Sequence, residues 1–139
     1  MSHLSQKCKC CGCTEVGYYE HMEIVVAREP ISQETLSELA SEWYISLVKG
    51  VADIERGVIA LGGEWHMDAN NRLIEDGSAQ KNVWGFNVYP KEKGGTAIEY
   101  ISLINIRPSQ GNRSMEIESA ETRAAVRRAV AKMIPFLGL

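Results

Sequence analysis

The stretch that decides the fold is Val51-Ala52-Asp53-Ile54-Glu55-Arg56-Gly57-Val58-Ile59-Ala60-Leu61. Its two ends, residues 51–54 and 57–61, are apolar and rich in β-branched side chains, which is typical of buried strands. The segment Glu55-Arg56-Gly57 between them is charged and contains glycine, so it predicts a tight turn. This stretch therefore predicts two neighbouring antiparallel strands.

Helical patterns lie on both sides of this hairpin. Ser32 is a suitable N-cap for a helix whose apolar residues follow at helical spacing up to Gly50. Ser119 precedes a second amphipathic helix, whose regular part should end at Pro135. A shorter helix is predicted after Asp68. The two long helices need an apolar surface to cover, and the sheet provides it.

Three more segments read as strands, namely Met22–Arg28, Val83–Tyr89 and Thr96–Ile106, the last being the longest candidate. The order of elements predicts a single α+β domain over residues 22–139. We expect a mostly antiparallel sheet of about five strands, with two long helices packed on one face.

Composition narrows the class of protein. The 139 residues are 45% apolar and 24% charged, which is ordinary for a globular chain, and no apolar run is long enough to span a membrane. The net charge of −3 gives no basic surface for nucleic acid, so nucleic acid is not the expected partner. The basic residues Arg123, Arg127 and Arg128 are expected on a solvated helix face, with a docking patch as the alternative.

All the cysteines lie in one short segment, Cys8-Lys9-Cys10-Cys11-Gly12-Cys13. This spacing is too tight for the paired knuckles of a structural zinc site, but Cys8, Cys10, Cys11 and Cys13 together form a candidate clasp for a soft metal ion or a redox-active cluster. The alternative is that residues 1–21 are an appended leader without such a role. With no cysteine elsewhere, a disulfide framework is not expected and a cytoplasmic location is.

A first polar motif is Glu64-Trp65-His66-Met67-Asp68. If this segment is extended, Glu64, His66 and Asp68 project from one face. Two carboxylates and an imidazole are a ligand set for a divalent ion such as Zn²⁺, Mn²⁺ or Fe²⁺, and equally a general acid–base group. The alternative is a solvent-exposed strand face that ends with Asp68 as a helix cap.

A second polar motif runs from Asn105 to Ser114. Arg107 and Arg113 are natural clamps for a carboxylate or a phosphate, and Asn112 and Asn105 add amides around them. If Val83–Tyr89 pairs with Thr96–Ile106, Asn87 would share their face. The alternative is an ordered surface turn in which Asn, Ser and Gly fill their usual places.

Several longer motifs stand out along the chain, namely Arg28-Glu29-Pro30-Ile31-Ser32, Asp53-Ile54-Glu55-Arg56-Gly57, Gly62-Gly63-Glu64-x-His66-x-Asp68-Ala69, Glu75-Asp76-Gly77-Ser78, Trp84-Gly85-x-Asn87-x-Tyr89-Pro90 and Ser102-Leu103-Ile104-Asn105-Ile106-Arg107-Pro108-Ser109-Gln110-Gly111-Asn112-Arg113-Ser114. With these motifs the chain resembles, over about residues 22–134, a small family of uncharacterised prokaryotic proteins, a domain of unknown function. The resemblance implies a free-standing domain and assigns no activity or ligand.

Two functional hypotheses follow. In the first, the protein is a hydrolase or transferase that acts on a small anionic substrate, with Glu64, His66 and Asp68 as catalytic or metal-binding residues. In the second, it is a binding module without catalysis, which recognises a carboxylate or phosphate through the loop 107–114. The first hypothesis requires the two polar motifs to meet in one site, and a homo-oligomer is compatible with either.

Overall fold

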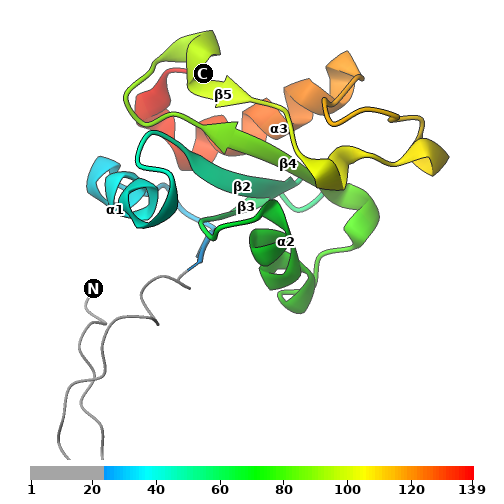
Figure 1. The fold of residues 1–139 in the computed structure, drawn as a ribbon, viewed down its shortest axis with the longest axis horizontal. Helices are drawn as coiled ribbons and strands as arrows, with labels where there is room; N and C mark the ends of the chain where they lie inside the picture. The colour runs from blue at the N-terminus through cyan, green and yellow to red at the C-terminus, as the bar shows by residue number, and fades with distance from the viewer. Residues whose placement is uncertain (1–23) are drawn as a thin grey trace, which may run out of the picture.

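A computed structural model describes residues 24–139 of the chain (Figure 1). The predicted leader, residues 1–21, and the cysteine cluster within it lie outside the described residues. The strands and helices follow in the order β1 (Val25–Ala27), α1 (Gln33–Trp43), β2 (Val48–Asp53), β3 (Val58–Leu61), α2 (His66–Glu75), β4 (Val83–Val88), β5 (Ile98–Glu99) and α3 (Ala120–Met133). Short 3-10 segments are η2 (Gln80–Asn82), η3 (Gly94–Ala97), η4 (Leu103–Asn105), η5 (Pro108–Gln110) and η6 (Pro135–Leu137).

The strands form one five-stranded sheet in the order β1-β3-β2-β4-β5, and every neighbouring pair is antiparallel. The predicted hairpin is confirmed as β2 and β3. The side chain of Asp53 builds its turn, because Oδ1 accepts hydrogen bonds from the backbone N–H groups of Glu55 and Arg56 at 2.9 and 3.0 Å. Gly57 completes the turn with a positive φ of 72°, which glycine adopts without strain.

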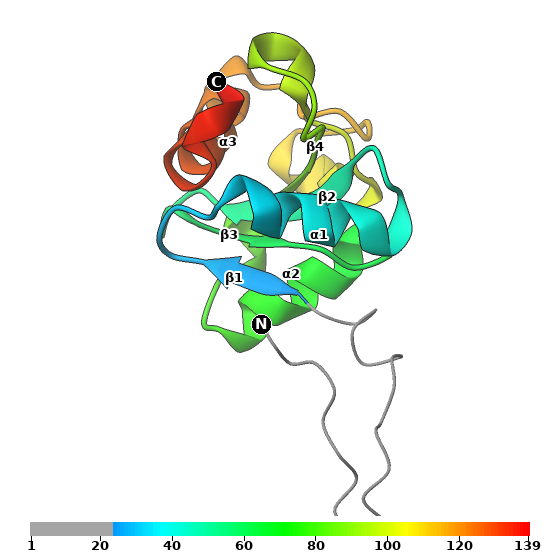
Figure 2. The ribbon, with the colours of Figure 1, turned by 90° about the vertical axis from the view of Figure 1, so that its left-hand side faces the viewer.

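The helices cover both faces of the sheet: the two long helices α1 and α3 lie on one face, as predicted, and a third helix, α2, covers the other face. Helices α1 and α3 share one core with Ala52 and Phe86, whereas α2 packs its Leu73 against Val51 on the other face. Figure 2 shows α2 and α3 on opposite sides of the strands. Residues of β2 and β4 therefore alternate between two buried environments, and the third helix makes the domain a three-layer α+β structure.

The predicted caps of the two long helices are confirmed. The hydroxyl of Ser32 accepts a hydrogen bond from the backbone N–H of Thr35, and the hydroxyl of Ser119 accepts one from Thr122. Each bond pairs one of the free N–H groups of a first turn, and such caps stabilise a helix by about 1 kcal/mol. Helix α3 ends before Pro135, as predicted.

The prediction of one long strand over Thr96–Ile106 is wrong. Only β5 pairs with β4, and the chain then leaves the sheet and forms η4. The hydroxyl of Ser102 accepts a hydrogen bond from the N–H of Ile104, which turns the backbone away from the extended conformation. The apolar residues of this segment therefore alternate as in a strand although they belong to a bent loop.

The prediction that Glu64–Asp68 is extended is also wrong. Helix α2 begins at His66 with Trp65 as its N-cap, and Oδ2 of Asp68 accepts a hydrogen bond from the N–H of Trp65 at 3.0 Å. Asp68 thus stabilises the first turn from inside the helix, because the N-cap lies three residues before the position predicted from sequence. In residues 24–139, no helix is long and apolar enough to cross a membrane.

Candidate functional site

The three residues of the first polar motif have separate surroundings. The backbone carbonyl of Glu64 accepts a hydrogen bond from the hydroxyl of Tyr44 at 2.6 Å, and the carboxylate of Asp68 is bound to the start of α2. His66 is only 8% exposed, and its Nε2 lies 2.9 Å from the carbonyl oxygen of Phe86 in β4. The catalytic and metal-binding roles of these residues stay predictions, since no contact tests them.

The burial of His66 decides its protonation state. Burial lowers its pKa from 6.5 to about 4, against the hydrogen bond to the Phe86 carbonyl and the side chain of Asn87, which favour the charged form. The positive charge of Lys49 acts in the same direction as burial. His66 is therefore neutral at pH 7 and donates its Nε2 proton to the Phe86 carbonyl.

A row of polar side chains crosses the sheet beside His66. Lys49 of β2 is paired directly with Asn87 of β4, and Asn87 is paired directly with Glu99 of β5. Directly opposed residues of an antiparallel pair project to the same face, with Cβ atoms about 5 Å apart. We call Lys49, Asn87 and Glu99 the cross-sheet row. It lies on the α2 face, at the end of the sheet where α2 begins.

The amide of Asn87 has a fixed orientation. Its Nδ2 donates a hydrogen bond to Oε1 of Glu99 at 3.2 Å, and an ionised carboxylate can only accept, so the amide cannot be turned over. The opposite atom, Oδ1, is buried and makes no hydrogen bond of ordinary geometry among residues 24–139, although the Asn87 side chain lies beside His66 and favours its charged form. Asn87 is only 8% exposed. A buried acceptor without a partner costs about 1–3 kcal/mol, so this residue carries a local cost in stability.

Tyr89 completes the arrangement around Glu99. Its hydroxyl donates to the same Oε1 of Glu99 at 2.7 Å, and this bond raises the pKa of Tyr89 to about 12. Both donors therefore bond one oxygen of the carboxylate, and Oε2 has no partner among the described residues. Glu99 is a positioned carboxylate with one free acceptor.

Lys49 lies at the other end of the row. Its Nζ is 4.9 Å from the centre of the Tyr44 ring, a cation–π contact. Within the described part of the chain, Lys49 has no ion-pair partner. Within the described residues, Lys49 thus lies without an ion-pair partner on one side of the buried amide of Asn87. On the other side lies Glu99, whose Oε2 accepts no hydrogen bond.

The second polar motif is an internally bonded loop. The side chain of Asn105 is fully buried and bonds both the N–H and the carbonyl of Gly85. Asn112 donates from Nδ2 to three backbone carbonyls and accepts from the N–H of Glu118. Arg107 donates to the carbonyls of Ile104, Gln80 and Val83, and its guanidinium lies 4.4 Å from the centre of the Trp84 ring.

The hydrogen bonds of Asn105 and Arg107 attach the loop to the part of β4 that does not pair with β5. An anion that reached Asn105, Arg107 or Asn112 would have to displace them. The guanidinium of Arg113 makes no hydrogen bond or ion pair within residues 24–139, while its backbone N–H donates to the carboxylate of Glu118, whose pKa this bond lowers. Anion binding by these residues stays a prediction. Arg113 is the best candidate among them, because its guanidinium is not bonded within residues 24–139.

The structure brings His66 and Asn87 together but keeps them apart from the loop. Arg107 bonds the carbonyl of Val83, whereas His66 bonds that of Phe86, three residues further along β4. At about 3.3 Å per residue, these contacts are about 10 Å apart along the strand. The two predicted motifs therefore share β4 and contact different parts of it.

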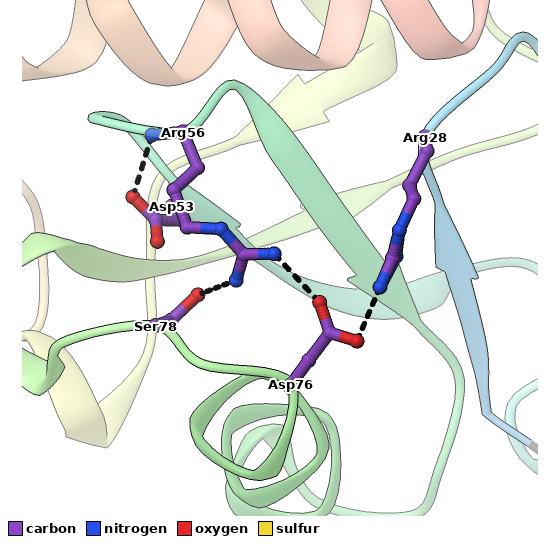
Figure 3. A network of polar contacts seen from close by, with 5 residues as sticks. All are labelled: Arg28, Asp53, Arg56, Asp76 and Ser78. Atoms are coloured by element: carbon purple, nitrogen blue, oxygen red, sulfur yellow. Dashed lines mark hydrogen bonds and ion pairs between the residues drawn. The ribbon is translucent and has the colours of Figure 1, made fainter.

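A second network joins the far end of the sheet to α2 (Figure 3). Asp76, at the end of α2, lies between the guanidinium groups of Arg28 and Arg56, and accepts from both. Arg56 also donates to the hydroxyl of Ser78 at 2.7 Å. These bonds, Arg56 first, lower the pKa of Asp76. The side chains of this network, Arg28, Arg56, Asp76 and Ser78, all bond within it. We therefore interpret the network as a structural contact that holds β1, the hairpin and α2 together.

A metal site is not apparent in the described part of the chain. No group of three or more His, Cys, Asp or Glu side chains in residues 24–139 is placed to hold a metal ion. Cys8, Cys10, Cys11 and Cys13 lie outside the described residues, so their role as ligands stays a prediction.

The sequence patterns point to His66 and Asn87, but they do not predict that Lys49, Tyr89 and Glu99 belong to the same site. Only strand pairing brings these residues together, and they are far apart along the chain. The signal that was available is their isolation: Lys49 is the only charged residue between Trp43 and Asp53, and Glu99 interrupts an apolar strand.

Comparison with known proteins gives a family without a function. The chain belongs to the family described as "Protein of unknown function (DUF5674)", which matches residues 25–133. This confirms the expected membership in an uncharacterised family. No curated protein and no solved structure matches the chain.

Proposed function

We propose that the protein binds a small polar molecule over the cross-sheet row of Lys49, Asn87 and Glu99. The observation that carries the proposal is the buried Oδ1 of Asn87, which has no partner among residues 24–139. The neighbouring Glu99 fixes the amide in this orientation, so Oδ1 stays available to accept a hydrogen bond from a bound molecule. A bound molecule that donates to this oxygen would remove the cost of leaving it unpaired.

Two side chains lie beside Asn87: His66, which is held by its bond to the Phe86 carbonyl, and Lys49. We therefore take access to Oδ1 to require a movement of Lys49. Lys49 is directly opposite Asn87, is half-buried, and is held within the described residues only by its contact with the Tyr44 ring. We therefore assign Lys49 as the movable cover of the site, with its ammonium group as the contact for an anionic part of the ligand. The other buried oxygen without a partner, Oδ2 of Asp53, is enclosed in the hairpin turn and does not offer such access.

Hydrolase or transferase chemistry on an anionic substrate is the second candidate, and the positioned carboxylate of Glu99 favours it. Two donors fix Oε1 and leave Oε2 as a base or a nucleophile. His66 is a weaker choice as general base, because its pKa of about 4 lies well below neutral pH. We also propose a reducing, cytoplasmic setting, because residues 14–139 contain no cysteine to form a disulfide.

The test is a thermal-shift screen of the purified protein against amino acids, amines, carboxylic acids, nucleosides and sugar phosphates. The matched variant is Asn87→Leu, which keeps the shape of the side chain and removes the amide. We expect at least one class to raise the melting temperature of the wild type but not that of Asn87→Leu. A screen in which no compound separates the two proteins would contradict binding at the row.

A further inference from the structure

A cavity of about 400 Å³ lies between helix α1 and the loop that follows β4. Its volume is in the range of small-molecule sites. One side is formed by α1 and by Ile45, which follows the helix, and the other side by the loop residues 90–93. No residue of the cross-sheet row lines the cavity, so this is a different site from the one proposed above.

The cavity has an apolar floor and a polar rim. Ala40 of α1 and Pro90 of the loop line it, and both are buried. Gln33 and Ser37, about one turn apart on α1, also line it, but they are exposed and contribute an amide and a hydroxyl. A molecule that fits this cavity has an apolar part for the floor and a polar part for the rim.

The charged residues that line the cavity are both lysines. Lys91 is exposed and forms no ion pair within residues 24–139. Nζ of Lys93 donates to the backbone carbonyl of Phe136 at 2.7 Å, which leaves two of its three N–H donors for a ligand. Because lysine side chains are long and flexible, both ammonium groups can reach an anion at the rim.

The carboxylates nearest to the lining residues in the sequence do not line the cavity. Glu92 lies between the two lysines, and its Oε1 accepts a hydrogen bond from the hydroxyl of Thr96 at 3.2 Å. Glu34 and Glu38 each follow a lining residue of α1, so they project about 100° further around the helix. The charge that faces a molecule in the cavity is therefore positive.

Ile45 indicates what the apolar part of the ligand contacts. It follows the C-cap of α1, and its φ of 63° lies in the left-handed region, where glycine is usual and a β-branched residue is strained. Since 77% of Ile45 is exposed, packing within the described residues does little to offset this strain. Strained residues of this kind occur often at ligand sites. An apolar group in the cavity would pack against the exposed side chain.

We propose that this cavity binds a small organic anion, a carboxylate or a phosphate monoester with a short apolar chain. The chain lies against Ala40, Ile45 and Pro90. The charged group is bound by Lys91 and Lys93, and the polar groups of the rim donate further hydrogen bonds to it.

The test is an NMR titration of the ¹⁵N-labelled chain with hexanoate, hexyl phosphate, hexan-1-ol and inorganic phosphate. Hexan-1-ol lacks the anion, and inorganic phosphate lacks the apolar chain. The double variant Lys91→Met/Lys93→Met removes both charges of the cavity. The matched control is Lys81→Met/Lys132→Met, which removes two lysines at exposed positions that do not line it.

We expect hexanoate or hexyl phosphate to shift the backbone amide signals of Gln33 and Ser37 and to bind about tenfold more tightly than hexan-1-ol. The tighter of the two anions identifies the charged group. Lys91→Met/Lys93→Met should lose this tenfold advantage, which is the size that two partly exposed ion pairs predict, and should bind hexan-1-ol as the wild type does. The control variant and Asn87→Leu should bind every compound as the wild type does.

A further variant, Ile45→Gly, tests the apolar contact. We expect it to weaken hexanoate and hexan-1-ol alike, by about fivefold, because it removes apolar contact area. Its melting temperature should not fall, because glycine adopts a positive φ without strain. The proposal is overturned if no compound shifts the signals of the lining residues, if the anions bind no more tightly than hexan-1-ol, or if the two lysines can be replaced without effect on hexanoate.

Discussion

Three buried asparagines of this protein have different roles. Asn105 and Asn112 use their amides to hold backbone groups of the loop that follows β5. Asn87 donates a hydrogen bond from Nδ2, but its Oδ1 is buried without a partner in residues 24–139. An amide that is fully bonded stabilises the fold, whereas one that is half bonded is a candidate for binding.

This contrast predicts effects of different size on the free energy of unfolding. Asn87→Leu removes an unpaired acceptor along with one hydrogen bond, so we expect the free energy of unfolding to change by less than about 1 kcal/mol. Asn112→Leu leaves several backbone groups without partners, and we expect a loss of about 3 kcal/mol or more. Urea denaturation of both variants measures this. Equal losses would contradict the assignment of separate roles.

His66 makes stability depend on pH. Because its pKa falls from 6.5 in the unfolded chain to about 4 in the fold, the unfolded state takes up a proton first as the pH decreases. The contribution of neutral His66 is complete above pH 6.5 and is lost as the pH falls to about 4, by about 3 kcal/mol in total.

Denaturation midpoints between pH 7.5 and 4 should therefore fall in the wild type and fall less in His66→Gln. Asp76→Asn is the control, because the lowered pKa of Asp76 places its effect at more acidic pH. A pH dependence that is unchanged in His66→Gln would show that His66 titrates normally in the fold.

Helix and turn boundaries follow from the sequence where the interactions that set them span only a few residues. Ser32 and Ser119 cap the helices that their sequence motifs indicate, and Asp53 and Gly57 form the predicted turn. The segment after β5 was misread, because its apolar alternation fits a strand and the bond from Ser102 that bends it has no sequence signature.

Gly85 shows how the bent segment fits the sheet. A Cβ atom at this position would lie 2.5 Å from Cβ of Ser102, so only glycine allows η4 to approach β4 this closely. We expect Gly85→Ala to destabilise the fold by about 1–3 kcal/mol, the usual cost of overpacking.

Gly95→Ala is the matched control for Gly85→Ala, because a Cβ atom there would meet nothing within 4 Å. Thermal denaturation of the two variants should separate them clearly. If Gly85→Ala melts at the temperature of the wild type, Ser102 and η4 do not press on β4 as described.

For the whole molecule, pairing between distant strands assembles the site. Lys49, Asn87 and Glu99 lie on three strands, and their common row follows from a register that sequence patterns do not determine. The α+β class could be predicted from the order of elements, but the second covered face could not, because α2 looked like a minor helix after an extended segment.

The cysteine cluster gives a prediction for the full chain. Since residues 24–139 place no group of metal ligands together, we expect bound Zn²⁺ to depend on Cys8, Cys10, Cys11 and Cys13. After incubation with Zn²⁺ and desalting, the wild type and His66→Gln should retain the metal, and a variant with four serines should not. Metal lost in His66→Gln alone would instead place it at α2.

Binding at the cross-sheet row is tested most directly by the NMR spectrum of the ¹⁵N-labelled chain during titration with the compound that gives the largest thermal shift. The side-chain amide signal of Asn87 should shift on binding, because its Oδ1 gains a donor, while the corresponding signals of Asn105 and Asn112 stay in place as internal controls. Shifts that are confined to Arg113 and the loop 107–114, with the Asn87 signal unchanged, would contradict binding at the cross-sheet row.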